Sequence, residues 1–297
     1  MSEYVGRFAP SPTGPLHFGS VIAALGSRLE ARRAGGRWLL RIDDIDPPRQ
    51  QPGAIDHILR QLEALGLEWD GPVIYQGERQ DAYHEALARL RRDGQVYCCT
   101  CSRKALARTA ARGPLGPVYP GTCRDRPPAG IDDAALRLRL PPGRIALADR
   151  GQGEYALDTA REMGDPVVRR RDGLVAYHLA TTIDDAALGV TDVVRGADLL
   201  PSALVQQALQ AALALPALGW RHLPLAVAAD GDKLSKQTGA APVDPAAPLP
   251  ALLAAWRFLG QADPPEPPTE VSEFHRFALE SWDPDRIPAG PLPAPAA

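Results

Sequence analysis

The chain begins with a strand, a loop rich in proline and glycine, and a helix in direct succession. Residues 4–8 are predicted to form the strand, residues 10–19 the loop and residues 20–29 the helix. A second strand, predicted at 38–42, leads into the acidic run Asp43-Asp44-Ile45-Asp46. A strand that continues through such a loop into a helix is typical of parallel α/β folds, whose ligands bind at the carboxyl ends of the strands.

The alternation of helices and strands continues beyond this first unit. Helices are predicted at 54–65, where the apolar residues follow the helical period, and at 82–92. Strands are predicted at 174–180 and 190–195, followed by a helix at 201–215. We therefore expect an α/β fold with a Rossmann-like, doubly wound parallel sheet.

Composition restricts the class of protein. The formal net charge of -3 argues against a uniformly basic nucleic-acid coat, although a local basic face is compatible with it. The N-terminal segment MSEYVGR has no apolar signal core, and no stretch approaches the roughly 20 apolar residues of a membrane span. We expect a soluble, cytoplasmic protein without a membrane partner. In that compartment the four cysteines between Cys98 and Cys123 favour a metal site over disulfides.

Lysine is scarce, and its placement is informative. Of 33 basic residues only three are lysines, and two of these, Lys233 and Lys236, lie three positions apart. Lysine is a compact, flexible point charge that can follow a moving phosphate, whereas arginine is a rigid planar fork. The pair therefore indicates a phosphate-binding function.

The loop at 10–19 also has the features of a phosphate site. A loop that opens a helix after a parallel strand collects backbone N–H groups and the positive end of the helix dipole at one point. Gly14 and Gly19 allow close approach of a nucleotide, and His17 can donate a hydrogen bond to a phosphate oxygen. From the residues alone, the alternative is a proline-rich turn capped by a buried histidine. The other histidines show no ligand spacing and are expected to be packing or surface residues.

The two motifs together resemble the signatures of a known family, the glutamyl branch of the class I aminoacyl-tRNA synthetases. Residues 10–19, preceded by Arg7-Phe8-Ala9, resemble the first signature, and Lys233-Leu234-Ser235-Lys236 resembles the second. The run Val194-Arg195-Gly196-Ala197-Asp198-Leu199-Leu200 agrees as well, so the resemblance covers residues 4–240.

This resemblance implies an ATP site with magnesium as the accompanying ion. Ser20 stands where the general class I signature has a second histidine, a difference that the glutamyl branch shares. The residues implied to bind ATP are Pro10, His17, Gly19, Ser20, Lys233 and Lys236. The catalytic roles fall on His17, Gly19, Lys233 and Lys236, with Lys236 expected to contribute most to stabilising the transition state.

A pocket for glutamate can be argued from charge. Glutamate brings two carboxylates and one ammonium group, so a selective pocket needs arginine forks and an acid. By resemblance, Arg7 and Arg195 would hold carboxylate oxygens, and Ser11 and Tyr177 would add hydrogen bonds. Asp43 would take the ammonium group.

Asp43 departs from the pattern of the family, which usually carries glutamate there in an Arg-Ile-Glu-Asp run. The shorter side chain must shift the substrate, shift the strand or act through a water molecule. The run Asp43-Asp44-Ile45-Asp46 is also compatible with a helix cap or a magnesium-binding cluster.

Within the glutamyl branch, the chain most resembles the short paralogues that lack an anticodon-binding domain. A full glutamyl-tRNA synthetase needs a further helical domain, for which residues 241–297 are too few. The cysteine pattern resembles the zinc site of those paralogues. The resemblance implies tRNA-independent activation of L-glutamate, followed by transfer to the queuosine base in the anticodon of tRNA(Asp). The protein is expected to act as a monomer.

The resemblance implies one structural zinc ion per chain, held by Cys99, Cys101, Tyr119 and Cys123. Three thiolates and a phenolate can close a tetrahedral site that leaves no position for catalysis. Cys98 and Cys101 also form a C-x-x-C pair, so from the residues alone the first ligand is either Cys98 or Cys99. A second alternative is that all four cysteines are core residues that bind no metal. The resemblance favours Cys99.

These inferences predict four segments. Residues 1–93 and 146–240 form the two halves of the catalytic domain, and residues 94–145 form an inserted zinc-binding module. Residues 241–297 contain a helix at 249–259 and a proline-rich tail whose last ten residues are expected to be disordered. Three rival functions remain: a truncated synthetase that charges tRNA(Glu), a nucleotidyltransferase, and a non-catalytic zinc-stabilised module that binds RNA or a regulator.

Overall fold

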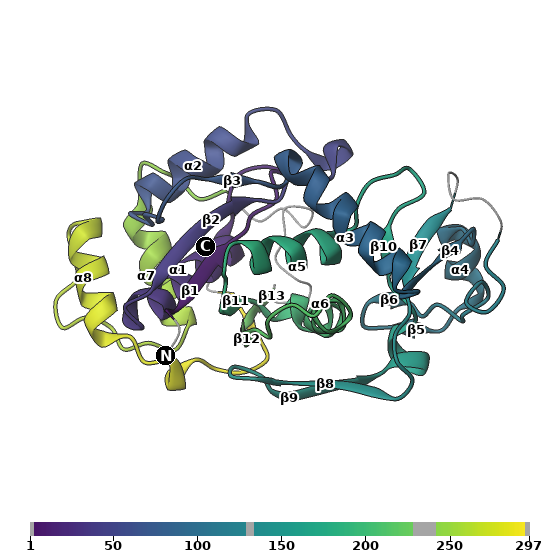
Figure 1. Ribbon diagram of the computed structural model, residues 1–297. Coiled ribbons are helices and arrows are strands. Elements are labelled where there is room, and N and C mark those ends of the chain that lie inside the picture. Colours follow the sequence, from purple (N-terminus) through teal and green to yellow (C-terminus); the bar gives the residue numbers. More distant parts are fainter. Residues whose placement is uncertain (1–2, 129–133, 228–241, 295–297) are drawn as a thin grey trace.

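A computed structural model describes residues 3–128, 134–227 and 242–294 of the chain (Figure 1). Within these ranges no helix is both long and apolar enough to cross a membrane. The Lys233-Leu234-Ser235-Lys236 motif lies outside the described residues.

The centre of the fold is a set of parallel strands (Figure 1). Strand β2 pairs in parallel with β1 and β3, and β11 pairs in parallel with β12. The two groups meet where the N–H of Thr191, just before β11, donates to the carbonyl of Val5 at 2.9 Å. The strands are β1 (Val5–Phe8), β2 (Arg37–Ile42), β3 (Ile74–Tyr75), β11 (Asp192–Gly196) and β12 (Gly219–Leu223). In the resulting order β3-β2-β1-β11-β12 all strands are parallel, and the chain adds strands to one side of β1 first and to the other side later. The boundary between β1 and β11 is therefore a topological switch point, the position where such sheets bind ligands.

Alternation along β2 separates two hydrophobic cores. Trp38 and Leu40 belong to the core that includes residues of α1, α2, α7 and α8, whereas Leu39 belongs to the core with α3, α5 and α6. Successive side chains of a strand point to opposite faces of its sheet. The helices are α1 (Phe18–Arg33), α2 (Ala54–Ala64), α3 (Gln80–Arg92), α5 (Tyr177–Ala187), α6 (Leu200–Ala212), α7 (Pro248–Phe258) and α8 (Val271–Ser281). Arg7 and Arg41 share the face of Leu39, and both are buried there.

The strand predicted at 174–180 is wrong, because α5 begins at Tyr177. A short apolar run cannot be assigned to strand or helix by periodicity alone. Here the buried positions continue through Thr181, Thr182, Asp184 and Asp185, which extends the run into a helix. The change matters for function because it places Tyr177 in the first turn of a helix.

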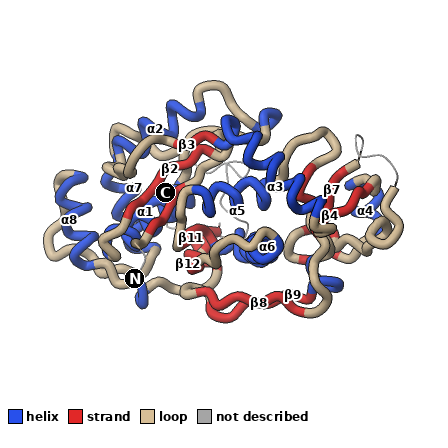
Figure 2. The backbone as a smooth tube through the Cα atoms, in the orientation of Figure 1, coloured by secondary structure: helices blue, strands red, loops and turns tan. Residues whose placement is uncertain are grey.

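Between α3 and α5 in the sequence the chain forms antiparallel elements, which lie at the right in Figures 1 and 2. Strand β7 (Ala135–Leu138) pairs with β4 (Val96–Cys99) and with β10 (Val167–Arg169). The hairpin of β8 (Arg144–Asp149) and β9 (Gly153–Asp158) extends back from this region below α6 toward β12 in the view of Figure 1. The short helix α4 (Arg103–Thr109) and the strands β5 (Arg112–Gly113) and β6 (Gly116–Pro117) complete the region.

The C-terminal region is more ordered than its composition predicted. Helix α8 was not expected, yet Phe274 and Ala278 are fully buried against the first core. Strand β14 (Pro291–Pro293) pairs in parallel with β13 (Leu225–Val227), which contradicts the disorder expected there. A proline without an N–H group is tolerated on such an edge strand.

Candidate active site

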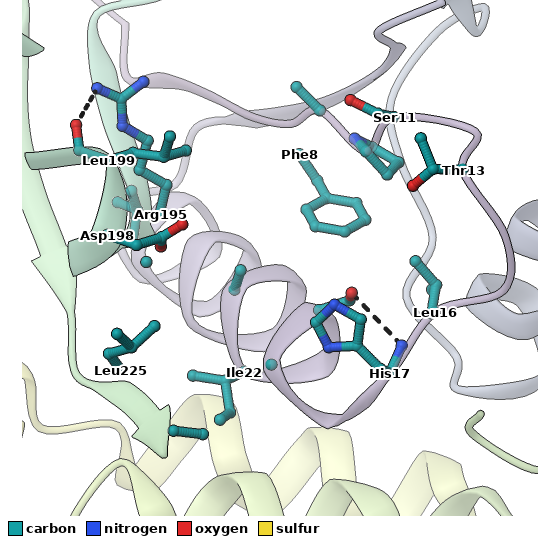
Figure 3. A pocket seen from close by; sticks show the side chains of 18 of the residues that line it. Phe8, Ser11, Thr13, Leu16, His17, Ile22, Arg195, Asp198, Leu199 and Leu225 are labelled. Atoms are coloured by element: carbon teal, nitrogen blue, oxygen red, sulfur yellow. Dashed lines mark hydrogen bonds between the residues drawn. The ribbon is translucent and has the colours of Figure 1, made fainter. Parts of the chain in front are cut away.

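A pocket with a volume of about 430 Å³ opens at the carboxyl ends of β1 and β11 (Figure 3). Its walls come from the loop after β1, the first turns of α1 and α5, and the end of β11. The predicted site residues that line it are Arg7, Pro10, Ser11, His17, Gly19, Ser20, Tyr177 and Arg195. The structure thus brings together side chains that are up to 188 positions apart (Arg7 to Arg195).

The loop after β1 is held in place by contacts with its neighbours. Gly14 has a φ of 128°, in the region that favours glycine. The N–H of Leu16 donates to Gln61 Oε1 at 2.7 Å, and the N–H of Asp43 donates to the carbonyl of Pro10 at 3.0 Å. These contacts fix the loop before a ligand arrives.

His17 caps the N-terminus of α1. The N–H of Ser20 donates to the backbone carbonyl of His17 at 2.8 Å, and the N–H of His17 donates to Ser20 Oγ at 3.4 Å. A methyl group added at Gly19 would lie 3.1 Å from the imidazole of His17. The ring is therefore packed over the helix start, where the N–H groups and the helix dipole favour an anion.

Arg7 enters the pocket from β1 and is almost fully buried. Its Nε and Nη2 donate to the two carboxylate oxygens of Asp185 at 3.1 and 3.2 Å. Burial opposes the charge on Asp185, but Arg7 and Arg41 outweigh it and lower the pKa of this carboxyl. The bidentate pair uses Nε and Nη2, and among the described residues no hydrogen bond is formed by Nη1 of Arg7, which lines the pocket.

A buried network of charges extends behind Arg7. Arg41 Nη1 donates to Asp185 at 2.6 Å, and Arg41 Nε donates to Asp43 at 2.7 Å. Asp184 accepts from Gln76 and Tyr83 and pairs with Arg79 at 2.6 Å. Burial raises the pKa of Asp43 to about 6, and Arg41 offsets it only in part.

Asp43 therefore lies in the layer beneath the pocket. It is 6% exposed and is absent from the residues that line the cavity. Its shorter side chain reaches Arg41, which connects it through Asp185 to Arg7. The direct contact with an ammonium group that the resemblance implies stays a prediction.

Arg195 enters the pocket from the end of β11, the strand next to β1. Its Nη1 donates to the hydroxyl of Tyr177 at 3.3 Å. Its Nη2 donates to the carbonyl of Leu199 at 3.1 Å, as Figure 3 shows. Its Nε donates to Nε2 of His222 at 3.1 Å. An arginine has five N–H donors. Each terminal nitrogen keeps one N–H beyond these contacts, which suits a carboxylate bound at two points.

The second signature motif lies outside the described residues, but the chain on both sides of it contacts the pocket. Leu225 and Ala226, which line the cavity, precede the undescribed segment. After it, Pro242 forms a bridge with His17, and the N–H of Val243 donates to the carbonyl of Leu16 at 3.0 Å.

A cysteine cluster lies away from this pocket, in the antiparallel region. The Sγ atoms of Cys99, Cys101 and Cys123 are within 4.8 Å of one another, and those of Cys101 and Cys123 are 3.8 Å apart. The hydroxyl of Tyr119 lies 3.4 Å from Cys99 Sγ and 3.9 Å from Cys101 Sγ. Tetrahedral zinc with Zn–S bonds of about 2.3 Å separates its sulfurs by roughly 3.8 Å, so the donor set fits such an ion.

Cys98 is excluded from this cluster by the alternation of β4. Cys99 points into the small core with Tyr97, whereas Cys98 packs against the core of α3, α5 and α6. The guanidinium of Arg137 lies 3.7 Å from the centre of the Tyr119 ring and packs against it in a cation–π contact. Burial, with the neighbouring Cys99, raises the pKa of the Tyr119 hydroxyl.

Comparison with known proteins identifies the class. A family model described as tRNA synthetases class I (E and Q), catalytic domain, matches residues 3–246. The chain therefore belongs to this family. More particularly, it is 51% identical over 98% of its length to the glutamyl-Q tRNA(Asp) synthetase of Chromobacterium violaceum, and covers 98% of that protein. The protein of the same name from Aromatoleum aromaticum is 52% identical over 94% of this chain and 89% of its own.

A solved structure agrees with this assignment. The glutamate-tRNA synthetase from Elizabethkingia anophelis superposes with a TM-score of 0.80 and 26% sequence identity. The match covers 99% of this chain and 68% of that one. The class I catalytic fold of this chain thus rests on sequence and on structure.

Sequence reasoning missed several residues of the pocket region. Asp198 and Leu225 line the cavity, and His222 contacts Arg195 from behind. Asp198 lies inside the run 194–200 that carried the resemblance, so it had a usable signal. His222 had none, because a histidine in a short apolar strand is typical of ordinary packing.

Proposed function

We propose that this protein activates L-glutamate with ATP and transfers the glutamyl group to the queuosine base in the anticodon of tRNA(Asp). The observation that carries the proposal is the name shared by relatives that are about half identical over nearly the whole chain. The pocket supports it because two buried arginines, Arg7 and Arg195, line the cavity at the ends of the neighbouring strands β1 and β11.

Recognition of glutamate is assigned to these two arginines with Ser11 and Tyr177. Burial lowers the pKa of Arg195, and the nearby Arg7 contributes to the same shift. A bound carboxylate would relieve this unfavourable positive charge, which a neutral or cationic substrate could not do. Asp43 is proposed to act on the ammonium side of the substrate, as the resemblance implies.

Recognition of ATP is assigned to the loop after β1 and to the lysine pair. Pro10, His17, Gly19 and Ser20 offer the helix N-terminus to the phosphates. Lys233 and Lys236 would place positive charge beside the negative charge that develops on the leaving pyrophosphate. Magnesium bound to ATP would neutralise part of the same charge.

The chemistry proceeds in two steps. An oxygen of the glutamate α-carboxylate attacks the α-phosphorus of ATP, the bond to the β-phosphate breaks, and pyrophosphate leaves. A hydroxyl on the cyclopentene ring of queuosine then attacks the activated carbonyl carbon, loses its proton and expels AMP. The product is a glutamate ester on the modified base.

A structural role is proposed for one zinc ion per chain. Cys99, Cys101, Tyr119 and Cys123 would hold it, and four protein ligands leave no position for a substrate. The ion would tie β4 to the loop that carries Tyr119 and Cys123. The four predicted segments, a monomeric state and a cytoplasmic location are part of the same proposal.

The deciding experiment measures transfer of labelled glutamate, with ATP and magnesium, to three purified RNAs. These are tRNA(Asp) with queuosine, the same tRNA without queuosine, and tRNA(Glu). We expect labelling of the first RNA alone. Labelling of tRNA(Glu) would instead identify a minimal glutamyl-tRNA synthetase. If no RNA is labelled and glutamate-dependent pyrophosphate exchange is absent, the proposal is wrong.

A further inference from the structure

The turn that joins β8 to β9 packs against His222 of β12, which contacts Arg195. His222 of β12 is fully buried, and Asp149 at the end of β8 is 5% exposed. His222 Nδ1 lies 2.6 Å from Asp149 Oδ2, and His222 Nε2 lies 3.1 Å from Arg195 Nε. A continuous chain of hydrogen bonds thus connects a hairpin outside the parallel sheet to a side chain that lines the pocket.

The contacts determine the tautomer of His222. Arginine nitrogens only donate hydrogen bonds, so Nε2 of the imidazole must accept from Arg195. The ring proton is then on Nδ1, which donates to Asp149. Burial is the largest influence and lowers the pKa of His222, with Arg195 acting in the same direction, so the ring is neutral.

Hydrogen bonds to the second carboxylate oxygen, Oδ1, hold Asp149 in one orientation. Oδ1 accepts from the backbone N–H groups of Gly151, Gln152 and His222 at 2.9, 2.8 and 3.0 Å. Burial opposes ionisation, but the bonds from His222 and Gly151 outweigh it and lower the pKa of Asp149 to about 2. The carboxylate is therefore charged, and only Oδ2 is directed at the imidazole.

We infer that Asp149 and His222 are positioning residues for the amino-acid pocket. Asp149 sets the tautomer and orientation of His222, and His222 in turn directs the Arg195 guanidinium at the substrate carboxylate. The inference rests on the proposed function and adds to it, since neither residue lines the pocket. The β8–β9 hairpin consequently controls affinity for glutamate without touching it. A contact of Arg195 with Trp220, 5.2 Å from its ring centre, restricts the guanidinium on another side.

Asp149→Asn tests this inference with little change of shape. The three backbone N–H groups require the asparagine oxygen at the Oδ1 position, which turns the NH₂ group toward His222. Nδ1 must then accept, so the ring proton moves to Nε2 and faces the N–H of Arg195. A comparable exchange in a Ser-His-Asp triad acts through the wrong tautomer.

The measurement is glutamate-dependent exchange between ATP and pyrophosphate, with separate values for glutamate and ATP. We expect Asp149→Asn to raise the KM for glutamate on the order of tenfold, as for one misdirected hydrogen bond to a charged group. The KM for ATP should stay within about twofold, because the ATP loop is not touched. Asp158→Asn is the matched control, since Asp158 also accepts from two backbone N–H groups but lies at the far end of the hairpin.

A second pair of variants covers the case in which Asp149→Asn does not fold. In His222→Gln the amide can still accept from Arg195 and donate to Asp149, so the KM for glutamate should stay near the parental value. His222→Leu can do neither and should raise it. Equal glutamate KM values in these variants and the parent would overturn the inference while leaving the proposed function intact. Absence of glutamate-dependent exchange in the parent protein would instead overturn the proposed function.

Discussion

Arg7 and Asp185 form a buried bidentate ion pair that joins the first strand to helix α5, with distances of 3.1 and 3.2 Å. The same carboxylate also accepts from Arg41 at 2.6 Å. One acid thus holds the pocket arginine and a second arginine that has no exposure to solvent.

Asp185→Asn should strongly destabilise the protein. It removes the negative charge that two buried guanidinium groups share, and breaking a buried pair in this way costs about 3 to 5 kcal/mol. The free energy of unfolding in denaturant measures the effect. Asp263→Asn is the control. The ion pair of Asp263 with Arg257 has the same 2.6 Å length as that of Asp185 with Arg41, but both of its side chains are exposed to solvent. That exposed pair should contribute less than about 1 kcal/mol, and equal losses in both variants would contradict the prediction.

Lys236→Ala should lower the rate of glutamate activation far more than it changes affinity for glutamate. A group that stabilises charge only in the transition state affects kcat, and its loss costs on the order of 100-fold or more. Lys104→Ala, in helix α4, provides a control with the remaining lysine of the chain. Activation by the Lys236→Ala protein at the parental rate would exclude this role.

The cysteine cluster should bind one zinc ion per chain, measured by metal analysis of the purified protein. Cys101→Ser should lose the metal, and its melting temperature should fall because the ion ties β4 to the loop at 119–123. Cys98→Ser should retain the metal, since Cys98 faces the other core. Zinc in the first variant, or its loss from the second, would show that the ligands are assigned wrongly.

Stability should fall as the pH is lowered from about 6.5 toward 4. Burial lowers the pKa of His178 and of His275 to about 4, below the ordinary value of 6.5. Over this window the unfolded chain binds protons at these two histidines that the folded chain does not, so they make acid favour unfolding. Asp43, whose pKa is raised to about 6, opposes them with a single proton. Unfolding free energies at several pH values measure the slope.

His275→Gln should reduce that slope, because glutamine keeps a donor for the carbonyl of Leu65, which lies 2.7 Å from His275 Nε2, but does not titrate. His57→Gln, at an exposed position of α2, should leave the slope unchanged. An identical pH dependence in all three proteins would mean that His275 does not contribute.

Much of the site could be predicted from the sequence because its parts are local. Pro10, Ser11, His17 and Gly19 lie in one loop between a strand and a helix, and Arg195 ends another strand. The carboxyl ends of parallel strands meet at one edge of a sheet, so residues at those ends come together whatever the rest of the chain does. The cysteines are similarly close in sequence, and the structure gathers three of them.

The errors have a physical reason as well. The strand predicted at 174–180 became the first turn of α5, and the tail produced α8, because packing against a core selects between short apolar patterns. Asp43 is buried beside Arg41, and its contact with an ammonium group stays a prediction. The sequence shows that Asp43 is shorter than the usual glutamate, but it does not show that the side chain pairs with Arg41.

The sequence by itself determined the α/β class, the position of the pocket and many of the residue types that line it, because these follow from local periodicity and from motifs that lie within single loops. Only the tertiary structure decided which buried charges are paired. The contacts of Arg7 with Asp185 and of His222 with Asp149 span 178 and 73 positions. No local pattern encodes such pairs, since their partners are selected by the three-dimensional packing of distant elements and by the high cost of leaving a buried charge unpaired.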